Sequence, residues 1–124
     1  MKTKYYTICQ NNVEGYYKRN DEIDIFISVE ACCVEDAKLK LHAICDCWND
    51  YCPCCGDRFK TRIDYLSEED GHSIPMVYEE DYTNVTDKFW LQSDPKIKIY
   101  KINKTLITYS LKERKVIEGG NYEI

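Results

Sequence analysis

The chain's clearest strand pattern is Ile23-Asp24-Ile25-Phe26-Ile27-Ser28-Val29. Its β-branched residues occupy every second position, which makes one face of the strand apolar. An earlier segment, Lys2 to Cys9, is rich in Tyr and Thr and ends at residues that favour a turn. We therefore predict two strands that pair as an antiparallel hairpin with a long connection.

Residues 34–48 change to a helical period. Their apolar residues recur at spacings of three and four, which places them on one stripe of a helix: Val34, Ala37, Leu41, Ile44 and Trp48. Glu35 and Asp36 fall in the first turn, where the helix dipole favours negative charge. The pattern predicts one main helix from about residue 34 to residue 48.

Downstream, Phe59 to Leu66 alternates and is expected to be a strand, and residues 96–111 are expected to form a C-terminal hairpin. Gly119 and Gly120 indicate a flexible tail over residues 118–124. Together these elements predict a single α+β domain over residues 1–124. It would consist of an antiparallel sheet of about 4–6 strands with the main helix packed on one face.

Length and charge limit the classes of function. A chain of 124 residues makes one modest core. The net charge of −5 argues against nucleic-acid binding, because domains that hold a phosphate backbone are usually basic. No segment reaches the roughly 18 apolar residues of a membrane span, and Met1 to Gln10 lacks a signal-peptide core. We expect a protein of the cytoplasm without a membrane partner, whose cysteines are reduced thiols rather than disulfides.

The segment Cys52-Pro53-Cys54-Cys55-Gly56 has the spacing of a zinc knuckle, in which proline and glycine tighten a turn so that backbone amides face the sulfurs. The predicted cofactor is a structural Zn²⁺ held by Cys52 and Cys55, with two further ligands from Cys45, Cys47, Cys54 and His42. Four such ligands would leave no position for water, so the metal would be a scaffold. The alternative is a tight turn whose cysteines pack as small apolar groups.

The segment 67–87 carries seven acidic residues and no Lys or Arg, and is expected to be mostly loop. Acids around an apolar centre resemble the polar rim of an interface, and a negative patch steers encounter with a basic protein. The predicted partner-binding residues are Glu68, Glu69, Asp70, Met76, Tyr78, Glu79, Glu80 and Asp81. The alternative is a hydrated loop that keeps the protein in solution.

Amide and aromatic residues after the first strand form another candidate binding site. Amides can read donor and acceptor edges, tyrosines can stack on bases, and an arginine can meet a phosphate. Such a site would take a small nucleotide-like ligand and would consist of Gln10, Asn11, Asn12, Tyr16, Tyr17 and Arg58. The alternative is that the amides cap a turn and the tyrosines cover the sheet.

Four short motifs occur in the order Tyr5-Tyr6-Thr7-Ile8-Cys9-Gln10-Asn11-Asn12, Val29-Glu30-Ala31, Glu35-Asp36-Ala37 and Cys54-Cys55-Gly56-Asp57-Arg58-Phe59. In order and spacing they resemble a family of short proteins encoded by tailed bacteriophages, mainly over residues 3–60. The chain departs from that family at Val13-Glu14-Gly15, where the family tends to have Ser-Gly-Gly, and at Phe59, where it tends to have Trp.

The resemblance implies a phage origin and brings no activity with it. Cys9 and the cysteines from Cys52 to Cys55 belong to the family pattern, whereas His42, Cys45 and Cys47 do not. The three residues outside the pattern therefore make weaker candidates for metal ligands.

We expect the protein to act by binding and not as an enzyme, because His42 and His72 both sit in polar surroundings without an orienting partner. The leading hypothesis is a phage accessory or counter-defence protein that binds and inhibits a host bacterial protein in the cytoplasm of the infected cell. The alternatives are sequestration of a nucleotide-like immune signalling molecule and a zinc-stabilised structural or regulatory role. Edge strands could also pair two subunits as a homodimer.

Overall fold

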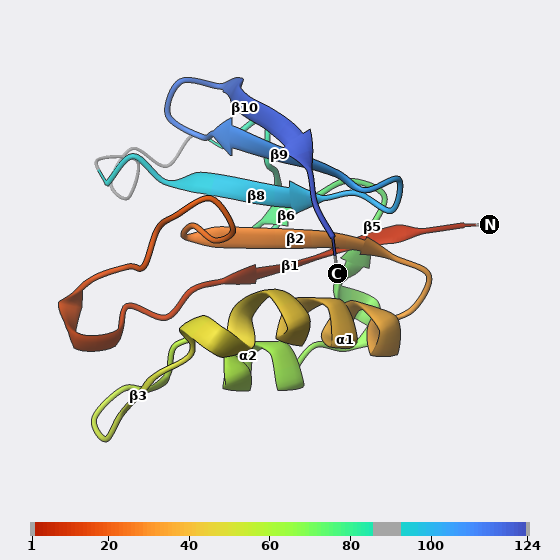
Figure 1. The fold of residues 1–124 in the computed structure, drawn as a ribbon. Coiled ribbons are helices and arrows are strands. Elements are labelled where there is room, and N and C mark those ends of the chain that lie inside the picture. Colours follow the sequence, from red (N-terminus) through yellow and green to blue (C-terminus); the bar gives the residue numbers. More distant parts are fainter. Residues whose placement is uncertain (1, 86–92, 124) are drawn as a thin grey trace.

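The computed structural model describes residues 2–85 and 93–123. Within these ranges, six strands form one mixed sheet in the order β10-β9-β8-β2-β1-β5 (Figure 1). The strands are β1 (Lys4–Cys9), β2 (Phe26–Ala31), β5 (Gly71–His72), β8 (Lys96–Tyr100), β9 (Thr105–Ser110) and β10 (Lys115–Asn121). The main helix, α1 (Val34–Cys45), packs on one face of the sheet, so the predicted α+β fold is confirmed.

The first hairpin and the main helix form close to where the sequence periodicity predicts them, but β2 begins at Phe26, three residues after the start of the pattern. Ile25 packs in the cluster on the opposite face from Ile23 and Ile27, so the predicted single apolar face is wrong at that residue. Strand β1 pairs antiparallel with β2, from Lys4 opposite Ala31 to Cys9 opposite Phe26. The apolar stripe of α1 is buried, and the helix itself ends at Cys45. A 3₁₀ turn, η2 (Asp46–Trp48), continues it to the expected end, where Trp48 packs partly buried against the same core.

Strand β8 runs parallel to β2, which corrects the expectation of a purely antiparallel sheet. Phe26 lies opposite Ile97, and the register continues to Val29 opposite Tyr100. Parallel neighbours need a crossover connection, and here the chain passes through the helices and the acidic segment before it returns. The buried Asp24 carboxylate accepts the backbone N–H of Lys96 at 3.2 Å, which fixes the start of β8 beside β2.

Residues 59–66 form a short helix, α2 (Lys60–Asp64), where a strand was predicted. Phe59 and Ile63 are both fully buried, and their spacing of four fits either a strand or a helix. Leu66 decides between them, because it is buried while Tyr65 is 82% exposed. A strand would bury Tyr65 on the face of Phe59 and Ile63, whereas a helix buries Leu66.

Strand β10 occupies Lys115–Asn121, so residues 118–121 belong to the sheet and the predicted tail is wrong over that range. It pairs antiparallel with β9 and contains an irregularity between Val116 and Glu118. The predicted hairpin of β8 and β9 is confirmed. Glycines have low strand propensity, which is why Gly119 and Gly120 were misleading.

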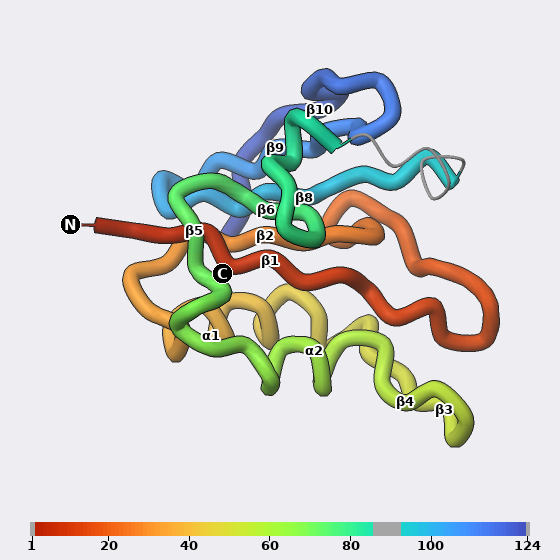
Figure 2. The backbone as a smooth tube through the Cα atoms, turned by 180° about the vertical axis from the view of Figure 1, so that it is seen from behind, coloured from red at the N-terminus to blue at the C-terminus, as the bar shows by residue number. Residues whose placement is uncertain are grey.

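A hydrophobic cluster covers each face of the sheet. On one face, Tyr6, Ile27 and Val29 pack with the stripe of α1 and with the buried residues of α2. On the other face, Phe26 and Ile97 pack with residues of the acidic segment, among them Val77 and Val85. Figure 2 shows the chain around β6 (Met76–Val77) and β7 (Glu80–Asp81) crossing this second face.

The remaining short elements carry the candidate sites. They are η1 (Val13–Gly15), β3 (Tyr51–Cys52), β4 (Gly56–Asp57) and η3 (Glu68–Asp70). Asp87, at the end of the predicted acidic loop, lies outside the described residues. In the described ranges we find no helix with the length and apolar character needed to cross a bilayer.

Candidate functional site

The cysteine hairpin, residues 51–57, joins β3 and β4 through a tight turn. Cys52 pairs with Gly56, and the N–H of Cys55 donates to the carbonyl oxygen of Cys52 at 3.3 Å. Pro53 suits the second position of this turn because its φ is fixed. Gly56 has a φ of +87°, a left-handed conformation that a side chain would strain. Proline and glycine therefore close the turn on which the cysteines sit.

Three thiols meet on this hairpin. The sulfurs of Cys52, Cys54 and Cys55 all lie within 4.8 Å of one another, and those of Cys52 and Cys54 are 3.0 Å apart. Cys54 and Cys55 are exposed, and Cys52 is partly buried. Cysteine sulfurs gathered in this way could hold a metal ion.

Hydrogen bonds within the turn favour ionisation of one of the three thiols. The thiol of Cys54, together with the backbone N–H groups of Cys54 and Cys55, lowers the pKa of Cys52 to about 7. The hydrogen bond between the two thiols, followed by the negative charge that develops on Cys52, raises the pKa of Cys54 to about 11. A thiolate is the form of cysteine that binds metal ions, so the turn supplies one near neutral pH.

The structure does not bring the other predicted metal ligands, His42, Cys45 and Cys47, into this cluster. His42 instead bridges two carboxylates, with Nδ1 2.8 Å from Asp46 and Nε2 2.9 Å from Asp64. Partial burial opposes protonation of His42, but these two hydrogen bonds outweigh it and raise the pKa of the imidazole. Cys45, the last residue of α1, is fully buried, and burial raises the pKa of its thiol. Cys47 is exposed on η2.

Arg58 does not serve as a ligand contact, because its side chain is fully buried and engaged by the chain itself. Its guanidinium donates to a carboxylate oxygen of Asp50 at 2.7 Å and to the side-chain oxygen of Gln10 at 2.9 Å. It also donates to the backbone oxygens of Tyr16 and Val13, at 2.7 and 3.2 Å. The ring of Tyr16 lies 4.7 Å from the guanidinium carbon, as in a cation–π contact. The predicted phosphate contact is thus a structural one.

Gln10 belongs to the same buried network and is only 1% exposed. Its amide oxygen accepts the N–H of Lys18 at 2.7 Å, and its nitrogen donates to the backbone oxygens of Lys18 and Asp24. Of the other residues predicted to bind a nucleotide-like ligand, Asn12 is exposed before η1 and forms no side-chain cap, and Tyr17 packs against the sheet. These residues form a junction within the fold and not a pocket.

Asn11 connects strand β1 to the cysteine hairpin. Its side-chain nitrogen donates to the backbone oxygens of Cys55 at 2.8 Å and Asp57 at 3.1 Å. Its backbone N–H donates to the carbonyl oxygen of Arg58 at 3.0 Å. From the other side, Asn49 accepts the N–H of Phe59 at 2.9 Å. Asn11, one of the amides predicted to bind a ligand, therefore helps to hold the hairpin in position.

An acidic groove of about 620 Å³ opens beside the β6–β7 hairpin. Its floor comes from the sheet and includes Thr7, Cys9 and Phe26. Residues predicted to bind a partner make up much of its rim: Glu69, Asp70, Met76, Tyr78 and Glu79. Ile8 and His72 complete the lining. Sequence reasoning missed the strand residues of the floor, whose alternation gave no sign of a groove.

The other predicted partner-binding residues lie outside this groove. Glu68 accepts hydrogen bonds from the backbone N–H of Val34 at 3.0 Å and from the hydroxyl of Tyr6 at 2.8 Å, which lower the pKa of its carboxyl. Glu68 therefore caps α1 and is corrected to a structural residue. Asp81 accepts the N–H of Thr83 at 2.9 Å within its own turn, and Glu80 is exposed on β7.

The turn between β6 and β7 has an unusual backbone. Tyr78 and Glu79 have φ angles of 51° and 43°, and they are the two residues between the paired Val77 and Glu80. A two-residue hairpin turn with positive φ at both positions normally carries Asn and Gly. The turn instead sets Tyr78 edge-on to Phe26, with ring centroids 5.7 Å apart, at the groove.

Residues 3–117 match the model of one protein family, described as Domain of unknown function (DUF7296). The chain belongs to this family. The cysteine hairpin, the Arg58 network and the acidic groove all lie within the DUF7296 match. No curated protein and no solved structure matches the chain.

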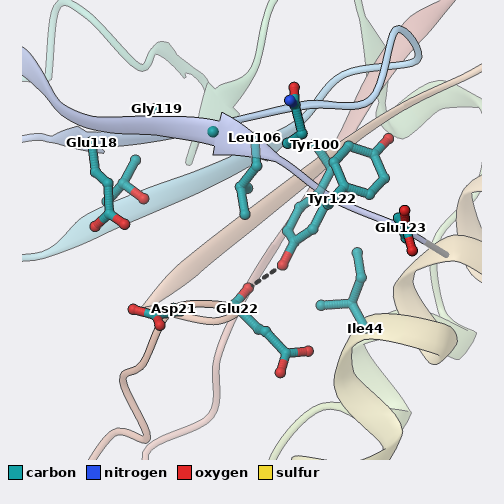
Figure 3. A pocket seen from close by; sticks show the side chains of 12 residues that line it. Asp21, Glu22, Ile44, Tyr100, Leu106, Glu118, Gly119, Tyr122 and Glu123 are labelled. Carbon is teal, nitrogen blue, oxygen red and sulfur yellow. Dashed lines mark hydrogen bonds between the residues drawn. The ribbon is translucent and has the colours of Figure 1, made fainter.

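A second cavity, of about 330 Å³, lies where β8, β9 and β10 extend past α1 (Figure 3). The rings of Tyr100 and Tyr122 meet at 4.8 Å between centroids, and the hydroxyl of Tyr100 donates to the backbone oxygen of Glu22. Ile44 from α1 and Glu118 from β10 also line it. Nothing in the sequence indicated this cavity, because the residues that line it are far apart in the chain. Its lining residues from Glu118 to Glu123 come after the part of the chain that matches DUF7296.

Proposed function

We propose that this DUF7296 protein is a bacteriophage accessory protein that binds and inhibits a host bacterial protein in the cytoplasm of the infected cell, without turnover. The observation that carries the proposal is the acidic groove, whose rim holds residues expected to bind a partner. The phage origin rests on the motif resemblance, above all on Cys54-Cys55-Gly56-Asp57-Arg58-Phe59. The counter-defence role follows from that origin.

The chemistry of the groove supports a partner that presents Lys or Arg. Glu69 and Glu79 are exposed at the rim and form no ion pair within the described residues. Tyr78, at 62% exposure, stands beside the buried ring of Phe26. Carboxylates around an aromatic centre suit a cation with an apolar stem, and the net charge of −5 favours encounter with a basic surface.

The backbone of the Tyr78-Glu79 turn supports the same proposal. A left-handed conformation costs roughly 1–2 kcal/mol for a residue that carries a side chain. Strain of this kind is concentrated at binding sites, where the side chain is worth more to function than the strain costs in stability. A turn selected for stability alone would carry Asn and Gly in these positions.

Charge reversal in the groove tests the proposal. We expect Glu69→Lys with Glu79→Lys to abolish capture of the host protein by the tagged protein, and to leave that host protein's activity uninhibited. The control pair, Glu14→Lys with Glu113→Lys, makes the same charge change at exposed positions outside the groove. Equal capture by both double variants would contradict a groove-mediated interaction.

The thiol cluster favours a second candidate function, that of a zinc-stabilised structural or regulatory protein. Zn²⁺ is the metal most often held by cysteine thiolates at this spacing, and binding would couple to the stability of the hairpin. A chelator should then lower the melting temperature, and Cys52→Ser should lower it and remove the chelator effect. An unchanged melting temperature with chelator would contradict this role. Sequestration of a nucleotide-like molecule gains no such support, because Arg58 is buried.

A further inference from the structure

We infer that the cysteine hairpin binds Zn²⁺ through three thiolates and leaves the fourth coordination position open to an imidazole or thiolate from a partner protein. The inference deepens the proposed zinc binding and rests on it. It replaces a closed structural site with one that needs a ligand from outside the chain. The ligand classes follow from the preference of Zn²⁺ for nitrogen and sulfur donors.

The three sulfurs are close to the arrangement that one ion requires. Zinc–sulfur bonds of about 2.3 Å at tetrahedral angles place sulfurs about 3.8 Å apart. The sulfurs of Cys52 and Cys54 are 3.0 Å apart, and all three pairs lie within 4.8 Å. Moving the sulfurs of Cys52 and Cys54 apart by about 0.8 Å would give that pair the required separation.

The turn is already held in place, so binding would order little additional chain. Asn11 donates to the backbone oxygens of Cys55 and Asp57, on either side of Gly56. The N–H of Arg58 donates to the carbonyl oxygen of Asp50 at 3.0 Å, which closes the base of the hairpin. A site fixed in this way loses little conformational entropy when the metal enters.

No fourth ligand reaches the cluster from the described part of the chain. Both ring nitrogens of His42 are engaged by carboxylates, and Cys45 is buried in the core of the fold. The two carboxylates nearest in sequence are also engaged: Asp57 accepts hydrogen bonds from Asn49 and Thr61, and Asp50 accepts one from Arg58. Cys47 is exposed but lies outside the cluster.

The position of the hairpin suits a ligand that arrives from outside. Figure 1 shows the β3 hairpin projecting away from the sheet, beyond the end of α1. Cys54 and Cys55 are exposed at its tip, so the open side of the three thiolates faces solvent. A bound water would occupy that position until a histidine or cysteine of a partner replaced it.

Cobalt substitution tests the inference directly, because the visible spectrum of Co²⁺ reports the ligands around it. The full chain is reduced with a phosphine, loaded with one equivalent of Co²⁺ and titrated with imidazole. We expect one ion per chain, sulfur-to-metal charge-transfer absorption, and a saturable change in the visible bands as imidazole replaces water. The same titration is repeated on four variants.

Cys54→Ser and Cys55→Ser should each weaken metal binding by more than about 100-fold, since loss of even an outer contact to a ligand costs 10–100-fold. The matched variants Cys47→Ser and His42→Gln should bind Co²⁺ as the unmodified protein does. If no metal binds to the reduced protein, both the zinc proposal and this inference are wrong. If metal binds, imidazole changes nothing and Cys47→Ser or His42→Gln weakens binding, the site is closed and only this inference is wrong.

Discussion

The Arg58 network and the acidic groove are both rich in polar groups, yet they serve opposite purposes. Around Arg58, the charged and amide groups bond to one another and to backbone oxygens in a site with no exposure of the arginine. In the groove, Glu69 and Glu79 face solvent beside a floor that includes Thr7, Cys9 and Phe26. Burial and hydrogen-bond partners, rather than residue type, separate polar residues that maintain a fold from those available to a ligand.

The largest expected effect is at Arg58. Arg58→Met removes the guanidinium that donates to the Asp50 carboxylate, to the Gln10 amide oxygen and to two backbone oxygens. Loss of one partner from a buried charged network costs about 3–5 kcal/mol of unfolding free energy. Urea denaturation measures this cost. Arg62→Met is the control, because Arg62 is exposed and donates to the backbone oxygen of Cys9 at 3.1 Å. Equal losses of unfolding free energy at the two arginines would contradict the structural role of Arg58.

A smaller effect is expected at Asn11. Asn11→Ala removes two hydrogen bonds to the cysteine hairpin, which corresponds to about 1–2 kcal/mol. The affinity for metal should fall about 10-fold or more, as it does when a contact that orients a ligand is lost. Asn12→Ala is the matched control, because Asn12 is exposed and caps no helix. Unfolding and metal titration should separate the two amides; a similar loss in both would contradict the assigned role of Asn11.

In the groove, one substitution is expected to raise the stability of the protein instead of lowering it. Glu79→Asn keeps the turn but places there a residue that tolerates positive φ, so we expect a gain of up to about 1 kcal/mol in stability. The same change removes a rim carboxylate and should weaken partner binding. Glu80→Asn makes the same charge change on strand β7 without relieving the turn. Greater stability with weaker binding in Glu79→Asn alone is the expected result, and a loss of stability there would contradict the strain argument.

The smallest effect concerns His42, which is neither buried like Arg58 nor open like the groove. Its folded-state pKa is raised above the ordinary value of 6.5 by Asp46 and Asp64. Its contribution to stability is therefore fully present below about pH 6.5 and is lost as the pH rises through the raised value. We expect His42→Gln to lower the urea midpoint at pH 5.5 by the equivalent of about 1 kcal/mol or less, and to have little effect at pH 9. His72→Gln should match the unmodified protein at both pH values.

Sequence periodicity predicted the elements whose burial is local. The helical stripe from Val34 was sufficient for α1, and the alternation of residues 23–29 located β2 to within three residues of its start. Phe59 and Ile63 fit two periods, and only the burial of Leu66 assigns α2. The parallel pairing of β8 with β2 depends on distant contacts that no local pattern contains. Strand β10 depends on β9 in the same way.

The candidate sites were predictable to a similar degree. The cysteines around Cys52 are close together in sequence, and so are the acidic residues around Glu79. Residue types alone therefore identified both groups. The role of Arg58 could not be predicted, because an arginine that binds phosphate and one that is buried in a network look the same in sequence. His42, Cys45 and Cys47 do not reach the thiol cluster. Their positions around a helix predict the direction of each side chain but not its distance from the cysteine hairpin, and metal binding depends on that distance.

The parallel pairing of β2 with β8 also has a consequence for the order in which the chain folds. Strand β8 can pair with β2 at Phe26 only after Ile97 has left the ribosome. At a synthesis rate of 5–20 residues per second, that interval is roughly 4–14 s, far longer than a hairpin or a helix needs to form. During this interval β2 is an edge strand with an aromatic side chain and no neighbour on one side. Exposure of this edge therefore falls during translation, and it ends when β8 pairs with β2.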